Sequence, residues 1–119
     1  MVDAPEGIAH WLKRRGTKVD ALLLTHQHFD HVLDAAAVRL DHGCTVHAWA
    51  PLSKDLTLEV LFGAVTGSSY SVPEFIVDEV LAGQSETRVA GERWELFHVP
   101  GHSPDSLCFY LPGEKLLFG

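Results

Sequence analysis

The stretch Thr25-His26-Gln27-His28-Phe29-Asp30-His31 lies between two segments whose apolar patterns predict regular structure. Residues 19–24 form a nearly continuous apolar run, which is typical of a β-strand buried on both faces. After the stretch, apolar residues recur at the spacing of one helix face before Gly43, and these residues are Leu33, Ala36, Ala37 and Leu40. The pattern therefore predicts that the histidine-rich stretch is a loop that leads from a buried strand into a helix.

Further segments extend this unit in both directions. Residues 44–49 resemble a second buried strand, which predicts a parallel strand-helix-strand unit over residues 19–49. A short amphipathic helix is expected over residues 6–15, with Asp3 as a candidate cap, and another helix over 55–62, followed by a loop or lid up to residue 73. Beyond it, short apolar segments separated by Gly and Pro predict an antiparallel meander, and they cover residues 75–81, 87–90, 93–99, 106–111 and 115–118. The predicted fold class is α+β, with α/β mixed character.

Composition limits the function classes. The chain of 119 residues is 46% hydrophobic and 21% charged, as expected for one globular domain or part of one. The net charge of -7 argues against a nucleic-acid partner, because binding to the phosphate backbone requires Lys and Arg. No apolar stretch reaches the length of a membrane span and no apolar leader is visible, so we expect no membrane partner and a cytoplasmic protein. Cys44 and Cys108 lack metal-site spacing and are expected to be free thiols.

The histidine-rich stretch concentrates side chains that bind metals. The imidazoles of His26, His28 and His31 and the carboxylate of Asp30 occur within six residues, a combination that suits zinc and also iron or manganese. Because alternate residues of an extended segment point the same way, His26 and His28 can face one metal, while Asp30 and His31 reach a neighbouring position. The pattern therefore predicts two adjacent metal subsites.

The remaining histidines have simpler interpretations. We expect His10 and His42 on the surface of helices, and His47 and His98 packed or hydrogen-bonded within strands. His47 is the one of these that could line the same end of the sheet as the histidine-rich stretch.

Two segments resemble a known family. Thr25 through His31 resembles the T-H-x-H-x-D-H signature of the metallo-β-lactamase superfamily. A second segment, Val99-Pro100-Gly101-His102-Ser103-Pro104-Asp105-Ser106, is similar to the P-G-H-[ST]-P-G-S segment of glyoxalase II-like members, with Asp105 where glycine is usual. This resemblance implies that His26, His28 and His102 hold the first metal and that Asp30 and His31 contribute to the second.

The resemblance also implies a fold and its extent. It predicts a partial metallo-β-lactamase αββα sandwich, with residues 1–119 as a single incomplete domain that is truncated at both ends. In the family, a strand resembling residues 116–119 is followed by an aspartate that bridges both metals, and a further histidine comes later. Neither is present before the chain ends at Gly119. Strand edges left exposed by truncation would favour a homo-oligomer.

The function implied is that of a metal-dependent hydrolase acting on small-molecule ester or thioester substrates. In such enzymes a metal-bound hydroxide attacks a metal-polarised carbonyl, and Asp30 would orient the hydroxide or take its proton. The expected cofactor is zinc, with two ions in the complete domain and with iron or manganese as alternatives. Other functions stay open: a noncatalytic metal-binding fragment, a mononuclear iron persulfide dioxygenase, and a lactonase or β-lactamase.

Overall fold

The computed structural model describes residues 1–119, which form five helices and seven strands. The helices are α1 (Ile8–Arg15), α2 (Phe29–Val32), α3 (Ala35–His42), α4 (Lys54–Thr57) and α5 (Glu59–Thr66). The strands are β1 (Ala21–Leu23), β2 (Thr45–Ala48), β3 (Glu79–Val80), β4 (Glu86–Val89), β5 (Glu92–His98), β6 (Leu107–Leu111) and β7 (Leu116–Phe118). They form a parallel sheet in the order β1-β2-β3 and an antiparallel sheet in the order β4-β5-β6-β7.

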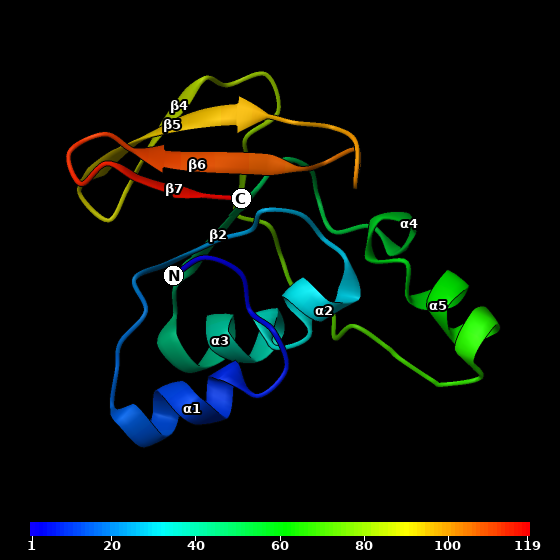
Figure 1. Ribbon diagram of the computed structural model, residues 1–119. Helices are drawn as coiled ribbons and strands as arrows, with labels where there is room; N and C mark the ends of the chain where they lie inside the picture. Colours follow the sequence, from blue (N-terminus) through cyan, green and yellow to red (C-terminus); the bar gives the residue numbers. More distant parts are fainter.

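The elements lie in layers (Figure 1). The antiparallel sheet is uppermost in this view, the parallel sheet lies beneath it, and α1, α2 and α3 lie below the parallel sheet. Helices α4 and α5 stand to one side, beyond α2. No helix is both long enough and apolar enough to cross a bilayer. The mixed parallel and antiparallel architecture confirms the predicted fold class.

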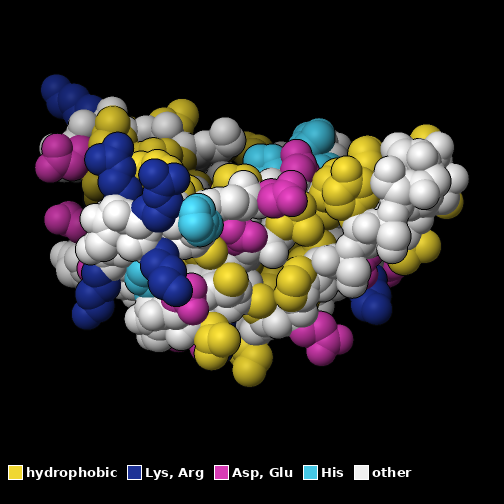
Figure 2. Space-filling model, turned by 90° about the horizontal axis from the view of Figure 1, so that it is seen from below, with side chains coloured by type: hydrophobic (Ala, Val, Ile, Leu, Met, Phe, Trp, Pro, Cys, Tyr) yellow, Lys and Arg dark blue, Asp and Glu magenta, His cyan; other side chains and the backbone are white.

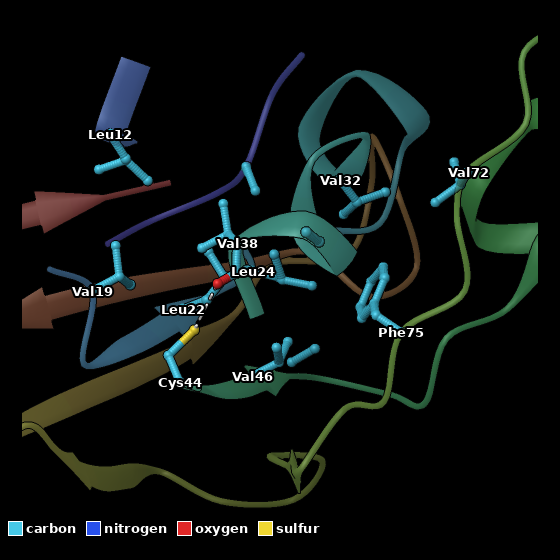
Figure 3. Close-up of a cluster of buried hydrophobic side chains, with 13 residues drawn as sticks. Leu12, Val19, Leu22, Leu24, Val32, Val38, Cys44, Val46, Val72 and Phe75 are labelled. Atoms are coloured by element: carbon cyan, nitrogen blue, oxygen red, sulfur yellow. Dashed lines mark hydrogen bonds between the residues drawn. The ribbon is translucent and has the colours of Figure 1, made fainter. Parts of the chain in front are cut away.

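One hydrophobic core lies between the parallel sheet and the helices (Figure 3). Leu22 and Leu24 of the β1 segment and Val46 of β2 are completely buried there. The helices contribute side chains that include Val32 and Val38 to the same cluster. Burial of each such side chain stabilises the fold by about 1.5–3 kcal/mol.

A second core lies between the two sheets. Ala21 and Leu23, which alternate with Leu22 along β1, face the antiparallel sheet and join a cluster with Leu107 and Phe109 of β6. Strand β1 is therefore buried on both faces, as its continuous apolar run predicts, and it pairs in parallel with β2 from Ala21 opposite Thr45. From residue 87 onward the predicted meander is also confirmed, with strand ends shifted by at most one residue.

The predicted helix face after the histidine-rich stretch is only partly correct. Leu33 and Ala36 are half-buried and pack against the core, but Ala37 and Leu40 are exposed. Leu40 is 83% exposed, whereas the buried residues are Val32, Ala35 and Val38. Residues 33–34 separate α2 from α3, so the segment is not one continuous helix with one stripe. Two apolar faces are available in this sequence, and the position of the helices on the parallel sheet selects the one that is buried.

Two other predicted segments also differ. The strand expected over residues 75–81 reduces to β3, which pairs in parallel with β2 and not with the meander. The backbone N–H of Val46 and the guanidinium of Arg39 both donate to the Asp78 carboxylate, which fastens this segment beside β2. The helix expected over 55–62 is divided into α4 and α5 at Leu58, whose φ of 57° ends the first helix.

Candidate metal centre

Two loops at one end of the sheets bring three histidines together. His26 and His28 lie on the loop between β1 and α2, and His102 lies on the loop between β5 and β6. Each offers a ring nitrogen, and these nitrogen atoms lie within 4.8 Å of one another. The ring centroids are 4.6 Å apart for His26 and His28, 5.0 Å for His26 and His102, and 4.5 Å for His28 and His102. We call these residues the three-histidine cluster.

Gln27 separates His26 from His28 and keeps both of them on the same side of the loop, as was predicted. Its side chain is completely buried and points away from the cluster, with Nε2 donating to the carbonyl oxygen atoms of Ala50 and Pro51. Its Oε1 accepts from the backbone N–H of Ser53. Because Gln27 is held on one side of the loop, its neighbours His26 and His28 are both held on the other side.

Asp3 organises the cluster from outside. Its Oδ1 accepts from the backbone N–H of Thr25 at 2.7 Å, and its Oδ2 accepts from the Thr25 hydroxyl at 2.7 Å. The single hydroxyl proton of Thr25 is thereby used, so Thr25 Oγ1 must accept the contact of 3.1 Å from Nδ1 of His26. His26 then carries its proton on Nδ1, and Nε2, which is buried without a hydrogen-bond partner, presents its lone pair.

The same carboxylate fixes a second imidazole. Asp3 Oδ2 accepts from Nδ1 of His31 at 2.8 Å, which leaves Nε2 of His31 as the free nitrogen. That nitrogen lies 3.7 Å from Asp30 Oδ2, and the His31 ring centroid is 4.1 Å from that of His26. Asp30 and His31 therefore lie beside the three-histidine cluster, where a second subsite was predicted.

The electrostatic setting favours neutral imidazoles. Burial, followed by the neighbouring rings of His31 and His28, lowers the pKa of His26 to about 4. Burial and the His102 ring lower the pKa of His28, and the carboxylates of Asp30 and Asp105 partly offset this effect. A neutral imidazole can bind a metal, whereas a protonated one cannot. The unpartnered Nε2 of His26 and the all-imidazole donor set together fit a borderline divalent metal such as zinc or iron.

The loop that carries His102 is held by its own contacts. The Ser103 hydroxyl donates to Oδ1 of Asp105, and both side chains are buried. The other Asp105 oxygen, Oδ2, is buried without a hydrogen-bond partner. His98 stacks on Trp49 with ring centroids 3.8 Å apart, and its Nε2 contacts the Pro104 carbonyl oxygen at 2.8 Å.

The sequence interpretation is corrected at one residue and extended at another. Asp3 does not cap α1, whose N-cap residue is Gly7, and instead supports the histidines. Asp105 fills the position where a glycine was expected, and its side chain is buried within the loop that carries His102. Local patterns could not reveal the role of Asp3, because its partners lie 22 and 28 residues away. His47 is buried, with Nε2 at 2.9 Å from the Thr45 hydroxyl, and it lies outside the cluster. His98 is exposed but contacts the Pro104 carbonyl oxygen, so both residues are packed or hydrogen-bonded as predicted.

Comparisons with known proteins extend over nearly the whole chain. The hydroxyacylglutathione hydrolase of Chromohalobacter salexigens is 32% identical over 114 residues, which are 93% of this chain and 36% of that protein. Hydroxyacylglutathione hydrolase GloC of Haemophilus influenzae is 30% identical over 124 residues, which cover 96% of this chain and 56% of that protein. The chain thus spans between about a third and just over half of the length of these relatives.

Solved structures show the same architecture. The BLEG-1 B3 metallo-beta-lactamase matches with a TM-score of 0.77 at 27% identity, covering 98% of this chain and 58% of that chain. The protein TTHA1623 in a di-iron-bound form matches with a TM-score of 0.71 at 30% identity, with the same coverage of 98% and 58%. The sequence profile of the Metallo-beta-lactamase superfamily matches residues 3–119. With its histidine loops and layered sheets matched over that range, this chain belongs to the metallo-β-lactamase superfamily.

Proposed function

We propose that this chain carries the metal-binding part of a hydrolase that cleaves ester or thioester substrates. The observation that carries the proposal is the three-histidine cluster, in which one buried nitrogen has no partner within the protein. The names of the relatives support a thioester substrate, because two of them are named hydroxyacylglutathione hydrolase. Their identity of about a third supports the reaction class more strongly than the particular acyl group.

The chain's own residues have separate roles in this proposal. His26, His28 and His102 hold the first metal, with His26 ligating through Nε2. When bound, a divalent metal acts as a Lewis acid on the substrate carbonyl and lowers the pKa of a coordinated water toward neutrality. Asp30, whose side chain is 62% exposed beside the cluster, orients the attacking water and takes its proton.

His31 and Asp30 form the beginning of a second subsite in this proposal. Asp3 holds the Nδ1 side of the His31 ring, so Nε2 is directed to the same space as the Asp30 carboxylate. Zinc is the proposed metal, because its preferred ligands are imidazole and carboxylate groups. Iron is the alternative, and the di-iron-bound form of the related protein TTHA1623 supports it.

The test combines metal analysis with hydrolysis. The chain is loaded with zinc or with iron, and the free thiol released is measured to monitor the cleavage of S-acylglutathione thioesters. We expect hydrolysis by the wild type, loss of metal and activity in His28→Ala, and neither loss in His10→Ala, which changes an exposed histidine of α1 that is not part of the cluster. If the wild type bound stoichiometric metal but released thiol no faster than His28→Ala, the noncatalytic metal-binding alternative would replace this proposal.

An oxygen electrode separates hydrolysis from iron-dependent oxidation. A hydrolase consumes water and no oxygen, whereas a persulfide dioxygenase consumes oxygen when it is given a glutathione persulfide. Oxygen uptake by the iron-loaded chain in the absence of thioester cleavage would favour the dioxygenase alternative.

A further inference from the structure

An apolar cavity opens directly beside the three-histidine cluster. It has a volume of about 340 Å³, and its walls include His28 and His102 of the cluster. Asp30 lies at the same wall, and the remaining lining residues are Phe29, Leu58, Leu61, Phe62 and Val65. In Figure 2, histidine side chains lie next to hydrophobic side chains on the face that is seen from below. A molecule whose reacting group is held at the histidines would therefore extend into this cavity.

Part of the cavity wall is one face of a helix. Leu58, Leu61, Phe62 and Val65 occur at the spacing of one face at the start of and along α5, and all four line the cavity. Leu61 is 60% exposed and Val65 is 77% exposed, although both are adjacent to the site. Residues 60–73 contain no charged side chain that could bind a charged substituent. The wall is thus suited to cover apolar surface only.

Aromatic contacts fix the position of this wall relative to the cluster. The ring centroid of Phe29, the residue after His28, lies 4.6 Å from that of Phe62 on α5. The Tyr70 ring completes the group, at 4.9 Å from Phe29 and 5.3 Å from Phe62. Rings at these distances attract one another beyond the effect of simple burial. Helix α5 is therefore tied to the histidine loop itself.

We propose that this cavity is a specificity subsite for an apolar group attached at the scissile bond of the substrate. The proposal rests on the proposed hydrolase function, and it assigns Leu61 and Val65 as the residues that determine specificity. Hydrolysis adds water across the acyl C–O or C–S bond and releases an acid and an alcohol or thiol. The apolar group can belong to the acid or to the alcohol or thiol that is released, because the apolar wall would contact it in the same way in both cases.

The experiment measures binding, so that it does not depend on turnover. Isothermal titration calorimetry gives dissociation constants of the zinc-loaded chain for two series of product-like ligands. The first series is acetate, butanoate, hexanoate and octanoate, and the second is the alkanethiols of the same lengths. We expect affinity to rise by about fourfold per methylene in at least one series until the cavity is filled, since burial of each methylene contributes ~0.8 kcal/mol.

A matched pair of variants tests the assignment. In the double variant Leu61→Ser/Val65→Ser, the rise in ligand affinity should fall to less than about twofold per methylene. Val60→Ser should keep the wild-type gain, because Val60 is 71% exposed on the same helix but does not line the cavity. Thermal unfolding of each variant confirms that it is folded before binding is compared.

The outcomes are distinct. A rising carboxylate series places the apolar group on the acyl side, and a rising thiol series places it on the leaving-group side. Affinity that does not depend on chain length in either series overturns the proposal, as does an equal effect of Val60→Ser. A dimer that the double variant dissociates, without any change in the ligand series, would assign the wall to contact between copies and would also overturn it. Failure of the hydrolase function itself is seen separately, as absence of thioester cleavage.

Discussion

Replacing Asp3 with Asn tests whether a carboxylate outside the three-histidine cluster controls its metal affinity. Asp3 has a φ of 55°, and Asn is among the residues that tolerate this left-handed region, so the backbone should keep its conformation. Asn retains one oxygen, which can still accept from the Thr25 backbone N–H. The other oxygen becomes an amide NH₂ facing two donors, the Thr25 hydroxyl and Nδ1 of His31.

The magnitude follows from the two hydrogen bonds that are lost. Each hydrogen bond to a charged group contributes about 1.5–3 kcal/mol, and the Thr25 hydroxyl can rotate to recover part of its loss. We therefore expect the free energy of unfolding of the metal-free protein to fall by about 2–4 kcal/mol. Zinc affinity should fall by about tenfold to hundredfold, as is typical when a partner of a ligating histidine is changed.

The assay is zinc competition against a chromophoric chelator, together with chemical denaturation of the metal-free protein. Nitrogen-15 chemical shifts of His31 report its tautomer, which should be Nδ1-protonated in the wild type and altered in Asp3→Asn. Asp34→Asn is the matched control, because the Asp34 carboxylate accepts from the backbone N–H of Ala9 at 2.9 Å and makes no hydrogen bond to a histidine of the site. If folded Asp3→Asn bound zinc within about twofold of the wild type and kept the same His31 tautomer, the reasoning would be refuted.

Three further predictions follow from the structure. His102→Ala removes one of the three clustered imidazoles and should weaken zinc binding by more than about a hundredfold, beyond the effect of an outer partner, as measured by the same competition assay. Burial lowers the pKa of His47, so below about pH 6.5 the unfolded chain binds more protons than the folded chain, and the free energy of unfolding falls as the pH falls. In urea titrations at several pH values, His47→Gln should reduce this pH dependence by up to about 1.4 kcal/mol per pH unit. Val38→Ala should lower the free energy of unfolding by about 2 kcal/mol because Val38 is completely buried, whereas Leu40→Ala should change it by less than about 0.5 kcal/mol. Denaturation experiments that gave the reverse order would contradict the observed helix face.

The strongest local patterns of the sequence were sufficient for the centre of the fold. The apolar run before Thr25 predicted a strand buried on both faces, and Leu22 and Leu23 occupy the two separate cores. Alternation along an extended segment predicted that His26 and His28 share a side, and the structure shows it. Such signals are reliable because they depend only on the geometry of successive residues and on burial. His102 was found through resemblance, and no pattern between the two loops would have joined them.

Relations between distant segments were decided only by tertiary structure. Periodicity allowed two apolar faces after the histidine loop, and packing on the parallel sheet buried Val38 and left Leu40 exposed. Strand β3 pairs with β2, where the Asp78 carboxylate accepts from the backbone N–H of Val46. The apolar pattern of residues 75–81 could not indicate this partner. The sequence by itself thus determined which side chains can bind a metal. The tertiary structure determined how Asp3 orients two of them and which helix walls the cavity beside them, because both depend on contacts between residues far apart in the chain.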